Sequence, residues 1–369
     1  MKAARLHQFG QPPSIDEVPI PEIGEEDVLV RVKAAGLNGG DPHFIKQDIR
    51  LRPDARDATP MRALPITMGH AAAGVIAKVG SQVRGVKDGD RVRMDGSIKC
   101  GKCHYCRTDQ ELLCEGLGIM GFVHLPLTEE GRDLAERYRE GCFAEYVKVP
   151  GANVHRLPDE IPFDQASQLG LLAVGYRATK KARVRPGETV IVNAASGGAG
   201  VCAILSARLF GAMRIIAVAR DGGRLKRVQE LIDPQIVETV TTEEDIQARV
   251  LELTGGKGAD VLIDYVPRGV ESAVQCIYSL RNGGRAVLVG GCTEELKVGY
   301  RFLMMKEIEL TASKGYASYE IPELMNLITR GKLDISRLVT HRFPLGEINH
   351  ALEVLERRMG DPIWVVLEP

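Results

Sequence analysis

Four of the eight cysteines lie within one short stretch, CGKCHYCRTDQELLC, at residues 100–114. The N-terminal sequence MKAARLHQFG has neither the apolar core nor the cleavage site of a signal peptide, so we expect a cytoplasmic protein with reduced thiols. Regular, tight cysteine spacing in a reducing compartment indicates a metal site rather than disulfides. A reduced cluster without metal is the alternative. The expected ligands are Cys100, Cys103, Cys106 and Cys114.

A second chemical motif is the Gly-rich stretch NAASGGAG at residues 193–200. Such a stretch also matches ordinary tight turns, but here an apolar strand precedes it, a helix follows it, and a second strand comes about twenty residues later. Gly197 and Gly198 would let the backbone approach a pyrophosphate, and Gly200 would let the helix pack close to the sheet. Ala195 replaces the usual first glycine. The expected dinucleotide contacts are Ser196, Gly197, Gly198, Ala199 and Gly200.

The end of that second strand bears on the choice of nucleotide. An NAD site has a carboxylate there, whereas this chain has Ala219 followed by Arg220, with Arg224 one turn into the next helix. Arginine matches a 2′-phosphate, and one charge-assisted bond would favour NADP by roughly 10–100-fold. Asp221 favours NAD instead, since its carboxylate could bind a ribose. The other alternative is that Arg220 and Arg224 only lie on the protein surface. We expect NADP.

The elements around these motifs change in character along the chain. The first 160 residues indicate short strands separated by Gly and Pro, at 27–38, 71–80, 89–94 and 142–150. After about residue 165, strands and helices alternate, which specifies a parallel sheet with helices on both faces. The strands are expected at 189–195, 214–220, 261–266 and 283–291, and the helices at 200–212, 222–232 and 270–280.

The remaining segments have weaker signals. Two amphipathic helices, within 318–333 and 347–358, are expected to pack back against the β-rich part. The charged segment 128–140 is expected to be a solvated excursion on the surface.

Composition excludes several classes of protein. A chain of 369 residues suggests two domains. Hydrophobic content of 44%, charged content of 26% and net charge −1 describe an ordinary globular protein. This balance gives no electrostatic basis for binding nucleic acid or an anionic membrane, and no apolar run has the roughly 20 residues that span a bilayer.

With these motifs in place, the chain resembles the medium-chain dehydrogenase/reductase superfamily of zinc alcohol dehydrogenases and quinone oxidoreductases. The resemblance runs nearly end to end, through KAARLHQFG, PITMGH (65–70), the cysteine cluster and FAEYVKVP (143–150). It implies an α/β protein: a β-rich GroES-like catalytic domain from residues 1–172 and 316–369, and a Rossmann domain, a doubly wound parallel sheet, from residues 173–315. The active-site cleft would lie between them.

The resemblance assigns the cysteines to a lobe at about 95–116 that binds structural zinc. Four thiolates complete a tetrahedral shell and leave no position for substrate. A zinc module for nucleic acid is disfavoured by the neutral charge and the single compact loop.

The catalytic zinc site of the alcohol dehydrogenase branch is not matched. Asn38 stands where that branch has a cysteine, its Gly-His-Glu motif reads Gly69-His70-Ala71, and its third ligand falls at about Leu171. Only His70 remains, and one imidazole cannot hold zinc tightly. We therefore expect one structural zinc and no catalytic zinc.

Without a Lewis acid, direct alcohol oxidation becomes harder. Zinc-free relatives instead add hydride to the β-carbon of a conjugated carbonyl. His43 falls where relatives place a proton-relay residue, and it could donate to a carbonyl or enolate oxygen. The alternative is that His43 lies on the surface or contacts the ribose. Asn38 could orient substrate or the cofactor carboxamide, His70 could be a second polar group, and Asp41 is expected to be structural.

The resemblance also maps the nicotinamide contacts to the ends of later strands. These are Val266, Gly290, Gly291 and the backbone around Lys314-Gly315-Tyr316, with Gly315 at the centre. Where many relatives have a basic residue near the C-terminus, this chain has Trp364, so a pyrophosphate contact there is not expected.

We therefore expect an enzyme, an NADP(H)-dependent reductase of a conjugated C=C in an enone, quinone or enoyl-type substrate. A zinc-free alcohol dehydrogenase or carbonyl reductase is the second hypothesis, and a nucleotide-binding protein without turnover is the third. The family precedent suggests a homodimer or homotetramer that uses the edge of the Rossmann sheet.

Overall fold

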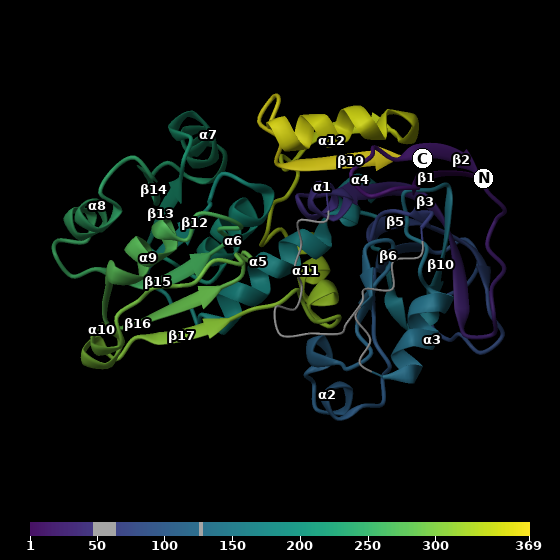
Figure 1. The fold of residues 1–369 in the computed structure, drawn as a ribbon, viewed down its shortest axis with the longest axis horizontal. Helices are drawn as coiled ribbons and strands as arrows, with labels where there is room; N and C mark the ends of the chain where they lie inside the picture. The colour runs from purple at the N-terminus through teal and green to yellow at the C-terminus, as the bar shows by residue number, and fades with distance from the viewer. Residues whose placement is uncertain (47–63, 125–127) are drawn as a thin grey trace. The chain divides into compact units, whose positions relative to one another are not determined.

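The structure is a computed structural model that describes residues 1–46, 64–124 and 128–369. The chain forms two compact units, the first built from residues 1–170 and 317–369 and the second from residues 171–316 (Figure 1). Among the described residues, no helix is both long and apolar enough to cross a bilayer.

The first unit is built on a seven-stranded sheet whose strand order is β11-β6-β5-β3-β19-β18, with β10 also paired to β3. Its strands are β3 (Asp27–Leu37), β5 (Ala71–Val79), β6 (Arg91–Asp95), β10 (Tyr146–Pro150), β11 (Val154–Arg156), β18 (Val339–Pro344) and β19 (Trp364–Glu368). Strands from both ends of the chain therefore share one sheet, since β19 pairs with β3. Apart from the exposed Arg31 and Lys33, β3 is buried along its length, as expected for a central strand.

Two small sheets and several short helices complete this unit. The sheets contain β1 (Lys2–Leu6), β2 (Ser14–Glu17) and β4 (Ile66–Thr67) in one, and β7 (Ser97–Ile98), β8 (Gly118–Ile119) and β9 (Val123–His124) in the other. The helices are α1 (Gly40–Ile45), α2 (His104–Arg107), η1 (Glu111–Leu113), α3 (Glu129–Arg137), η2 (Gly151–Asn153), α4 (Phe163–Ser167), α11 (Glu320–Thr329), η3 (Leu345–Glu347) and α12 (Ile348–Arg357). As expected, α11 and α12 belong to the β-rich unit.

The charged segment 128–140 differs from its expected solvated form. Thr128 caps α3 by accepting from the Gly131 backbone N–H at 3.1 Å. Directly after the helix, the buried Tyr138 donates to the carboxylate of Asp27 at 2.5 Å, and Arg137 donates to the same oxygen at 2.9 Å. A long-range carboxylate therefore holds this segment against β3, which local charge patterning does not indicate.

The second unit is a six-stranded parallel sheet with strand order β14-β13-β12-β15-β16-β17 (Figure 1). Its strands are β12 (Thr189–Asn193), β13 (Arg214–Ala219), β14 (Val237–Thr241), β15 (Ala259–Asp264), β16 (Leu280–Leu288) and β17 (Glu309–Ala312). Its helices are α5 (Leu169–Lys181), α6 (Gly198–Leu209), α7 (Gly222–Ile232), α8 (Ile246–Leu253), α9 (Glu271–Tyr278) and α10 (Tyr300–Lys306). In chain order the strands run 3-2-1-4-5-6, the Rossmann arrangement.

Helices cover this sheet on both faces, as predicted. One core joins Ile191, Ile216 and Leu262 of the sheet to Ile246 of α8 and Ile277 of α9. The intervening strand residues are also fully buried, because α6 packs against β12 and β13. The sequence did not single out β14, α8, α10 or β17.

Candidate functional site

The four predicted ligands of the cysteine lobe, residues 100–114, come together. Their sulfur atoms lie within 4.8 Å of one another, and among the described residues they are the one group of three or more metal-type donors so placed. Cys100 Sγ lies 3.6 Å from Cys114 Sγ and 4.0 Å from Cys106 Sγ. Zn–S bonds of about 2.3 Å in a tetrahedron would separate the sulfurs by roughly 3.8 Å. The residues therefore fit a structural zinc ion.

Backbone donors of the cysteine lobe favour thiolates. The N–H groups of Cys103 and Cys100 point at Cys100 Sγ and Cys114 Sγ, at 3.3 and 3.4 Å. A bond from the Cys106 backbone N–H lowers the pKa of Cys103 to about 6, whereas burial raises the pKa of Cys106 and Cys114. A bound cation would stabilise all four thiolates.

A polar network connects the cysteine lobe to the residues before α11. Lys99 donates to Glu111 at 2.8 Å and to the Ser318 hydroxyl at 2.5 Å. The Ser318 backbone N–H donates to the same Glu111 oxygen at 2.6 Å, and its hydroxyl donates to Asp95 at 3.2 Å. The lobe is thereby fixed to the β-rich unit at both of its ends.

A second polar group, the Asn38–His70 cluster, consists of Asn38, Asp41 and His70. Asn38 Nδ2 lies 3.2 Å from His70 Nε2, and the Asn38 backbone N–H donates to Asp41 Oδ2 at 2.8 Å. The other Asp41 oxygen lies 3.8 Å from His70 Nδ1. Asn38 follows β3, Asp41 sits in the first turn of α1, and His70 directly precedes β5. Two of the predicted catalytic residues therefore meet across 32 positions of sequence.

Burial sets the charge of the Asn38–His70 cluster. Desolvation lowers the pKa of His70 to about 4, helped by the positive charge of Arg93 and opposed by Asp95. Desolvation raises the pKa of Asp41 to about 7, against one backbone hydrogen bond from Asn38. His70 is therefore neutral near pH 7.

The cluster does not fit a tightly bound catalytic zinc. The Asn38 NH₂ group carries no lone pair for a metal, and it faces Nε2 of His70. Ala71, in the Glu position of the motif, offers no donor. Three protein ligands are needed for such a site, and these positions supply one.

Two contacts of this region were not found from the sequence. Asp41, which was expected to be structural, is buried, and its carboxylate accepts from the Asn38 backbone and faces His70; its position three residues after Asn38 was the available signal. Phe122 packs against the His70 ring with 5.2 Å between ring centroids, and no local pattern indicates it. His43, the third catalytic candidate, is half-buried in the last turn of α1.

The Gly-rich loop has the predicted strand–turn–helix form. Gly197 caps α6, and Ala194 before it has a positive φ of 58°. Gly200 is needed for packing, because a Cβ there would lie 2.5 Å from the Ala194 carbonyl oxygen. Gly197 faces open space instead, with one atom at 3.9 Å. Ser196, Gly197, Gly198 and Ala199 are partly exposed at the helix N-terminus, where a phosphate fits.

The predicted arginines differ in their surroundings. Arg224 is 5% exposed, and its Nη2 donates to the Ser196 carbonyl at 2.9 Å, so it supports the Gly-rich loop. Arg220 is exposed just beyond the end of β13. Asp221 caps α7 by accepting from the Arg224 backbone N–H at 3.0 Å, so one oxygen of its carboxylate is used within the helix.

The carboxyl ends of β12, β15 and β16 lie together where the strand order reverses. Asn193 donates to Asp264 at 2.8 Å across this point, and burial raises the pKa of Asp264 to about 6. A Cβ on Gly290 would lie 2.3 Å from the Val266 carbonyl oxygen, so two predicted nicotinamide contacts are adjacent. Gly291 and Gly315 have positive φ values in neighbouring loops. Ligands of such sheets bind at this reversal point.

Trp364, which stands where many relatives have a basic residue near the C-terminus, is fully buried in β19.

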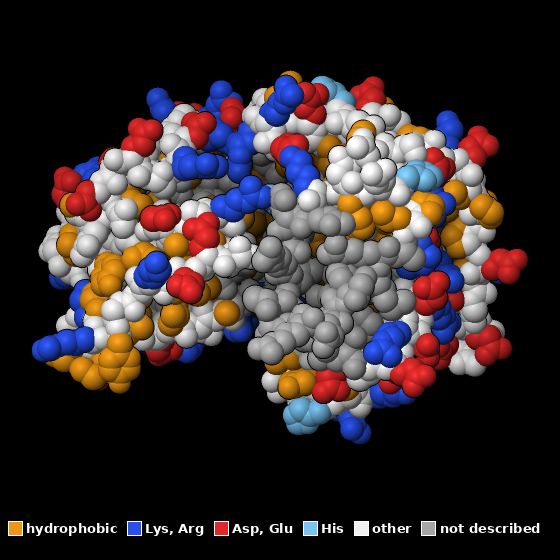
Figure 2. All heavy atoms as spheres, viewed as in Figure 1, with side chains coloured by type: hydrophobic (Ala, Val, Ile, Leu, Met, Phe, Trp, Pro, Cys, Tyr) orange, Lys and Arg blue, Asp and Glu red, His pale blue; other side chains and the backbone are white. Residues whose placement is uncertain are grey.

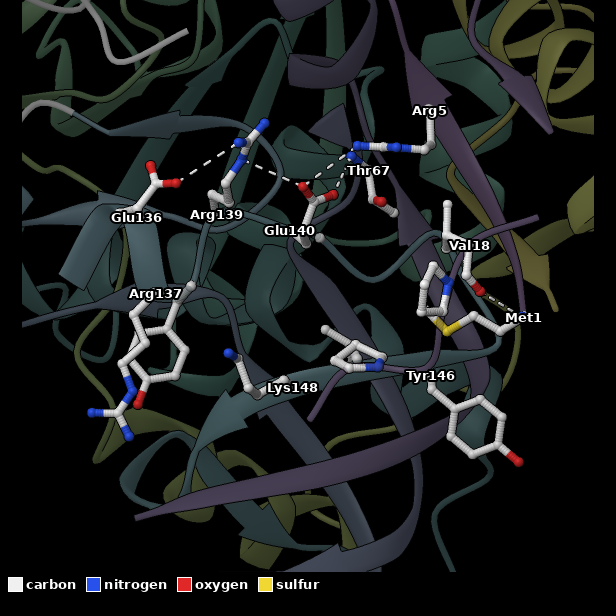
Figure 3. A pocket seen from close by; sticks show the side chains of 15 residues that line it. Met1, Arg5, Val18, Thr67, Glu136, Arg137, Arg139, Glu140, Tyr146 and Lys148 are labelled. Atoms are coloured by element: carbon white, nitrogen blue, oxygen red, sulfur yellow. Dashed lines mark hydrogen bonds and ion pairs between the residues drawn. The ribbon is translucent and has the colours of Figure 1, made fainter. Parts of the chain in front are cut away.

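A separate cavity of about 380 Å³ lies on the first unit (Figure 3). Arg5, Arg139 and Glu140 lie on its wall, where Glu140 pairs with both arginines at 3.6 and 3.4 Å. None of the predicted site residues lines it.

Two family models match the chain. Residues 24–159 match the alcohol dehydrogenase GroES-like domain, and residues 198–330 match the zinc-binding dehydrogenase family.

Characterised proteins are similar over almost the whole length. L-idonate 5-dehydrogenase of Vitis vinifera is 31% identical over 352 residues, 94% of this chain and 89% of that protein. Sorbitol dehydrogenase of Bacillus subtilis is 28% identical over 372 residues, 100% of this chain and 97% of that protein. Among solved structures, an NAD-dependent alcohol dehydrogenase has a TM-score of 0.84 at 30% identity, and both chains are fully covered. The alcohol dehydrogenase of Aeropyrum pernix has a TM-score of 0.82 at 30% identity, again with both chains fully covered.

Proposed function

Because the chain belongs to the medium-chain dehydrogenase/reductase superfamily and is an oxidoreductase, we propose that it reduces a conjugated C=C bond with NADPH and without a catalytic zinc. The substrate class is an enone, quinone or enoyl-type compound. The observation that carries this proposal is the contact between Asn38 and His70, where an amide occupies the position of a metal ligand.

The chemistry follows from what these positions offer. When bound, NADPH would supply the hydride for the β-carbon of the conjugated bond. Negative charge then develops on the carbonyl oxygen, and hydrogen-bond donors are sufficient to stabilise it. His43 is the candidate that returns a proton, since an imidazole can act as a general acid.

We assign the cofactor as NADP(H) on the basis of Arg220. Ala219 at the end of β13 stands where a carboxylate would select NAD, the exposed guanidinium of Arg220 follows it, and Asp221 is used as a helix cap. Replacing Arg220 with Ala should weaken NADPH binding about tenfold while leaving NADH binding unchanged. The matched control is Lys226→Ala, which removes an exposed cation from the helix that follows, α7. Equal losses for both cofactors would contradict the assignment.

A second candidate is a zinc-free alcohol dehydrogenase or carbonyl reductase. It is favoured by the names of the relatives, which include L-idonate and sorbitol dehydrogenases. Those names describe dehydrogenases, whereas the positions around His70 supply only one of the three protein ligands that a catalytic zinc ion needs.

One experiment separates the two candidates. NADPH oxidation is followed with conjugated enones, quinones, saturated aldehydes and saturated ketones, and the products are identified. Alkene reduction that leaves the carbonyl intact supports the first candidate. Carbonyl reduction without alkene reduction supports the second and overturns the first.

We also propose a homo-oligomer that uses β17. All four residues of this edge strand are exposed, and Tyr300, Met304 and Met305 of the neighbouring α10 are 81%, 53% and 64% exposed. Hydrophobic side chains gather around α10 at the lower left of Figure 2. An open edge beside an apolar patch is suited to pairing with a second copy. Light scattering should give two or four times the 40.3 kDa chain mass. A monomer mass would contradict this proposal.

A further inference from the structure

The orientation of the Asn38 carboxamide is determined by the backbone around it. The Gly40 N–H donates to Asn38 Oδ1 at 3.0 Å, and the Asn38 N–H donates to Asp41 Oδ2 at 2.8 Å. Because a backbone N–H requires an acceptor, the atom near Gly40 is the amide oxygen. The NH₂ group must therefore be the one that faces His70.

This orientation determines the tautomer of His70. An amide NH₂ only donates, so His70 Nε2 accepts the bond at 3.2 Å and the ring proton sits on Nδ1. A protonated imidazole could not accept this bond. The lowered pKa of His70 agrees with a neutral ring.

Asp41 and Phe122 hold the ring in place. His70 Nδ1 faces Asp41 Oδ1 at 3.8 Å, and among the described residues both buried atoms lack a hydrogen-bond partner. Asp41 is completely buried, and the Phe122 ring packs against the histidine with 5.2 Å between ring centroids. Asp41 thus binds the Asn38 backbone with one carboxylate oxygen and faces the imidazole with the other, so it contacts both residues.

One hydrogen of the Asn38 amide is left over. The NH₂ group carries two hydrogens, and His70 accepts one of them. Among the described residues Asn38 Nδ2 has no other partner, and the side chain is partly exposed. A fixed, partly exposed amide N–H is a suitable donor for a substrate oxygen.

We propose that Asn38 is a catalytic residue that donates a hydrogen bond to the substrate carbonyl oxygen, and that His70 and Asp41 are the residues that position it. This inference rests on the proposed reduction of a conjugated carbonyl compound. It assigns to a neutral amide the polarising role that a metal ion has in a zinc dehydrogenase. Loss of one such donor costs about 100–1,000-fold in rate.

The test uses two variants that remove the donor, Asn38→Ala and the near-isosteric Asn38→Leu. With saturating NADPH and trans-cinnamaldehyde, kcat should fall about 100–1,000-fold in both, while the affinity for NADP⁺ stays within about twofold. Infrared spectroscopy of cinnamaldehyde bound with NADP⁺ gives a readout without turnover. The carbonyl stretch should move to lower frequency in the wild-type complex and return to its free value in both variants.

His70 is tested by a matched pair. In His70→Gln the side-chain oxygen can still accept from Asn38, so kcat and the carbonyl frequency should stay close to wild type. In His70→Leu no acceptor remains, and kcat should fall about tenfold with a smaller frequency shift. A role in packing alone would change the thermal stability of both variants and leave the carbonyl frequency unchanged.

The two proposals fail in different ways. If the wild-type protein reduces only saturated carbonyls, the proposed alkene reduction is wrong, but the infrared shift still reports on Asn38. If wild type reduces the alkene and the Asn38 variants keep their kcat and carbonyl frequency, the role of Asn38 is overturned and the proposed function stands.

Discussion

The cysteine lobe and the Asn38–His70 cluster occupy one unit and differ in how they keep their shape. The helix α2 of the lobe has no buried residue, and η1 buries only Leu112. Around the cluster, Phe44 stacks on Phe122 with 5.0 Å between ring centroids, and both belong to the main core. The lobe thus has little apolar burial beside its four metal-type ligands, whereas packing and hydrogen bonds together hold the cluster.

The two regions also differ in what occupies the positions of the expected metal ligands. In the lobe a cation compensates for missing apolar burial, and losing any ligand leaves three thiols without a partner. In the cluster, two positions without a metal donor have other contacts: the Asn38 amide binds His70, and Ala71 is buried. Hydrogen bonding and packing therefore occupy two positions of the cluster where a zinc dehydrogenase has metal-binding residues.

The largest effect is expected from removing one thiolate from the lobe. Cys106→Ser should abolish zinc binding and lower the free energy of unfolding by several kcal/mol, because binding energy of a structural metal is folding energy. Zinc content by elemental analysis and chemical denaturation measure the two quantities. Cys292→Ser, outside the lobe, is the control and should keep its zinc. If Cys106→Ser were as stable as wild type, the lobe would not depend on metal.

A smaller effect is expected from damage to the packing around the cluster. Phe122 is 8% exposed and contacts both Phe44 and His70, so Phe122→Ala should cost about 3–5 kcal/mol. Its zinc content should remain that of wild type. Thermal unfolding together with metal analysis checks this prediction. Loss of zinc from this variant would mean that the two regions are coupled rather than separately maintained.

The smallest effect concerns pH. The pKa of Asp41 is about 7 in the folded protein and 3.8 ordinarily, so the folded state retains a proton that the unfolded chain releases. The stability from this group is complete below pH 3.8 and is lost as the pH rises through about 7. The amide introduced by Asp41→Asn would not titrate, so the variant should gain ~2–3 kcal/mol on wild type between about pH 5 and pH 8. Denaturation at both pH values measures the gain.

His70 changes stability in the opposite direction, since its pKa is lowered, but it is present in both proteins and cancels in the difference. A stability difference between the two proteins that does not vary with pH would show that folding does not raise the pKa of Asp41.

Local patterns were sufficient for half of the candidate site. The cysteine ligands span fifteen residues, and the Gly-rich loop is defined by the strand before it and the helix after it, so both could be predicted from short stretches. The alternation of strands and helices likewise predicted the parallel sheet.

What could not be predicted depends on long-range contacts. His70 meets Asn38 and Asp41 only because β3 and β5 pair, and Phe122 reaches His70 from a turn more than fifty positions later. Tyr138 lies in a segment whose charge suggested a solvated surface, and it is buried because Asp27 accepts its hydroxyl. Periodicity and composition contain no information on such pairs.

The central claim is that one region binds zinc for structure and the other acts without it. Elemental analysis of the purified wild-type protein, after dialysis to remove loosely bound metal, tests this claim most directly. One zinc ion per chain is expected in wild type and in His70→Leu, and none is expected in Cys106→Ser. Two zinc ions per chain, with one lost in His70→Leu, would contradict it.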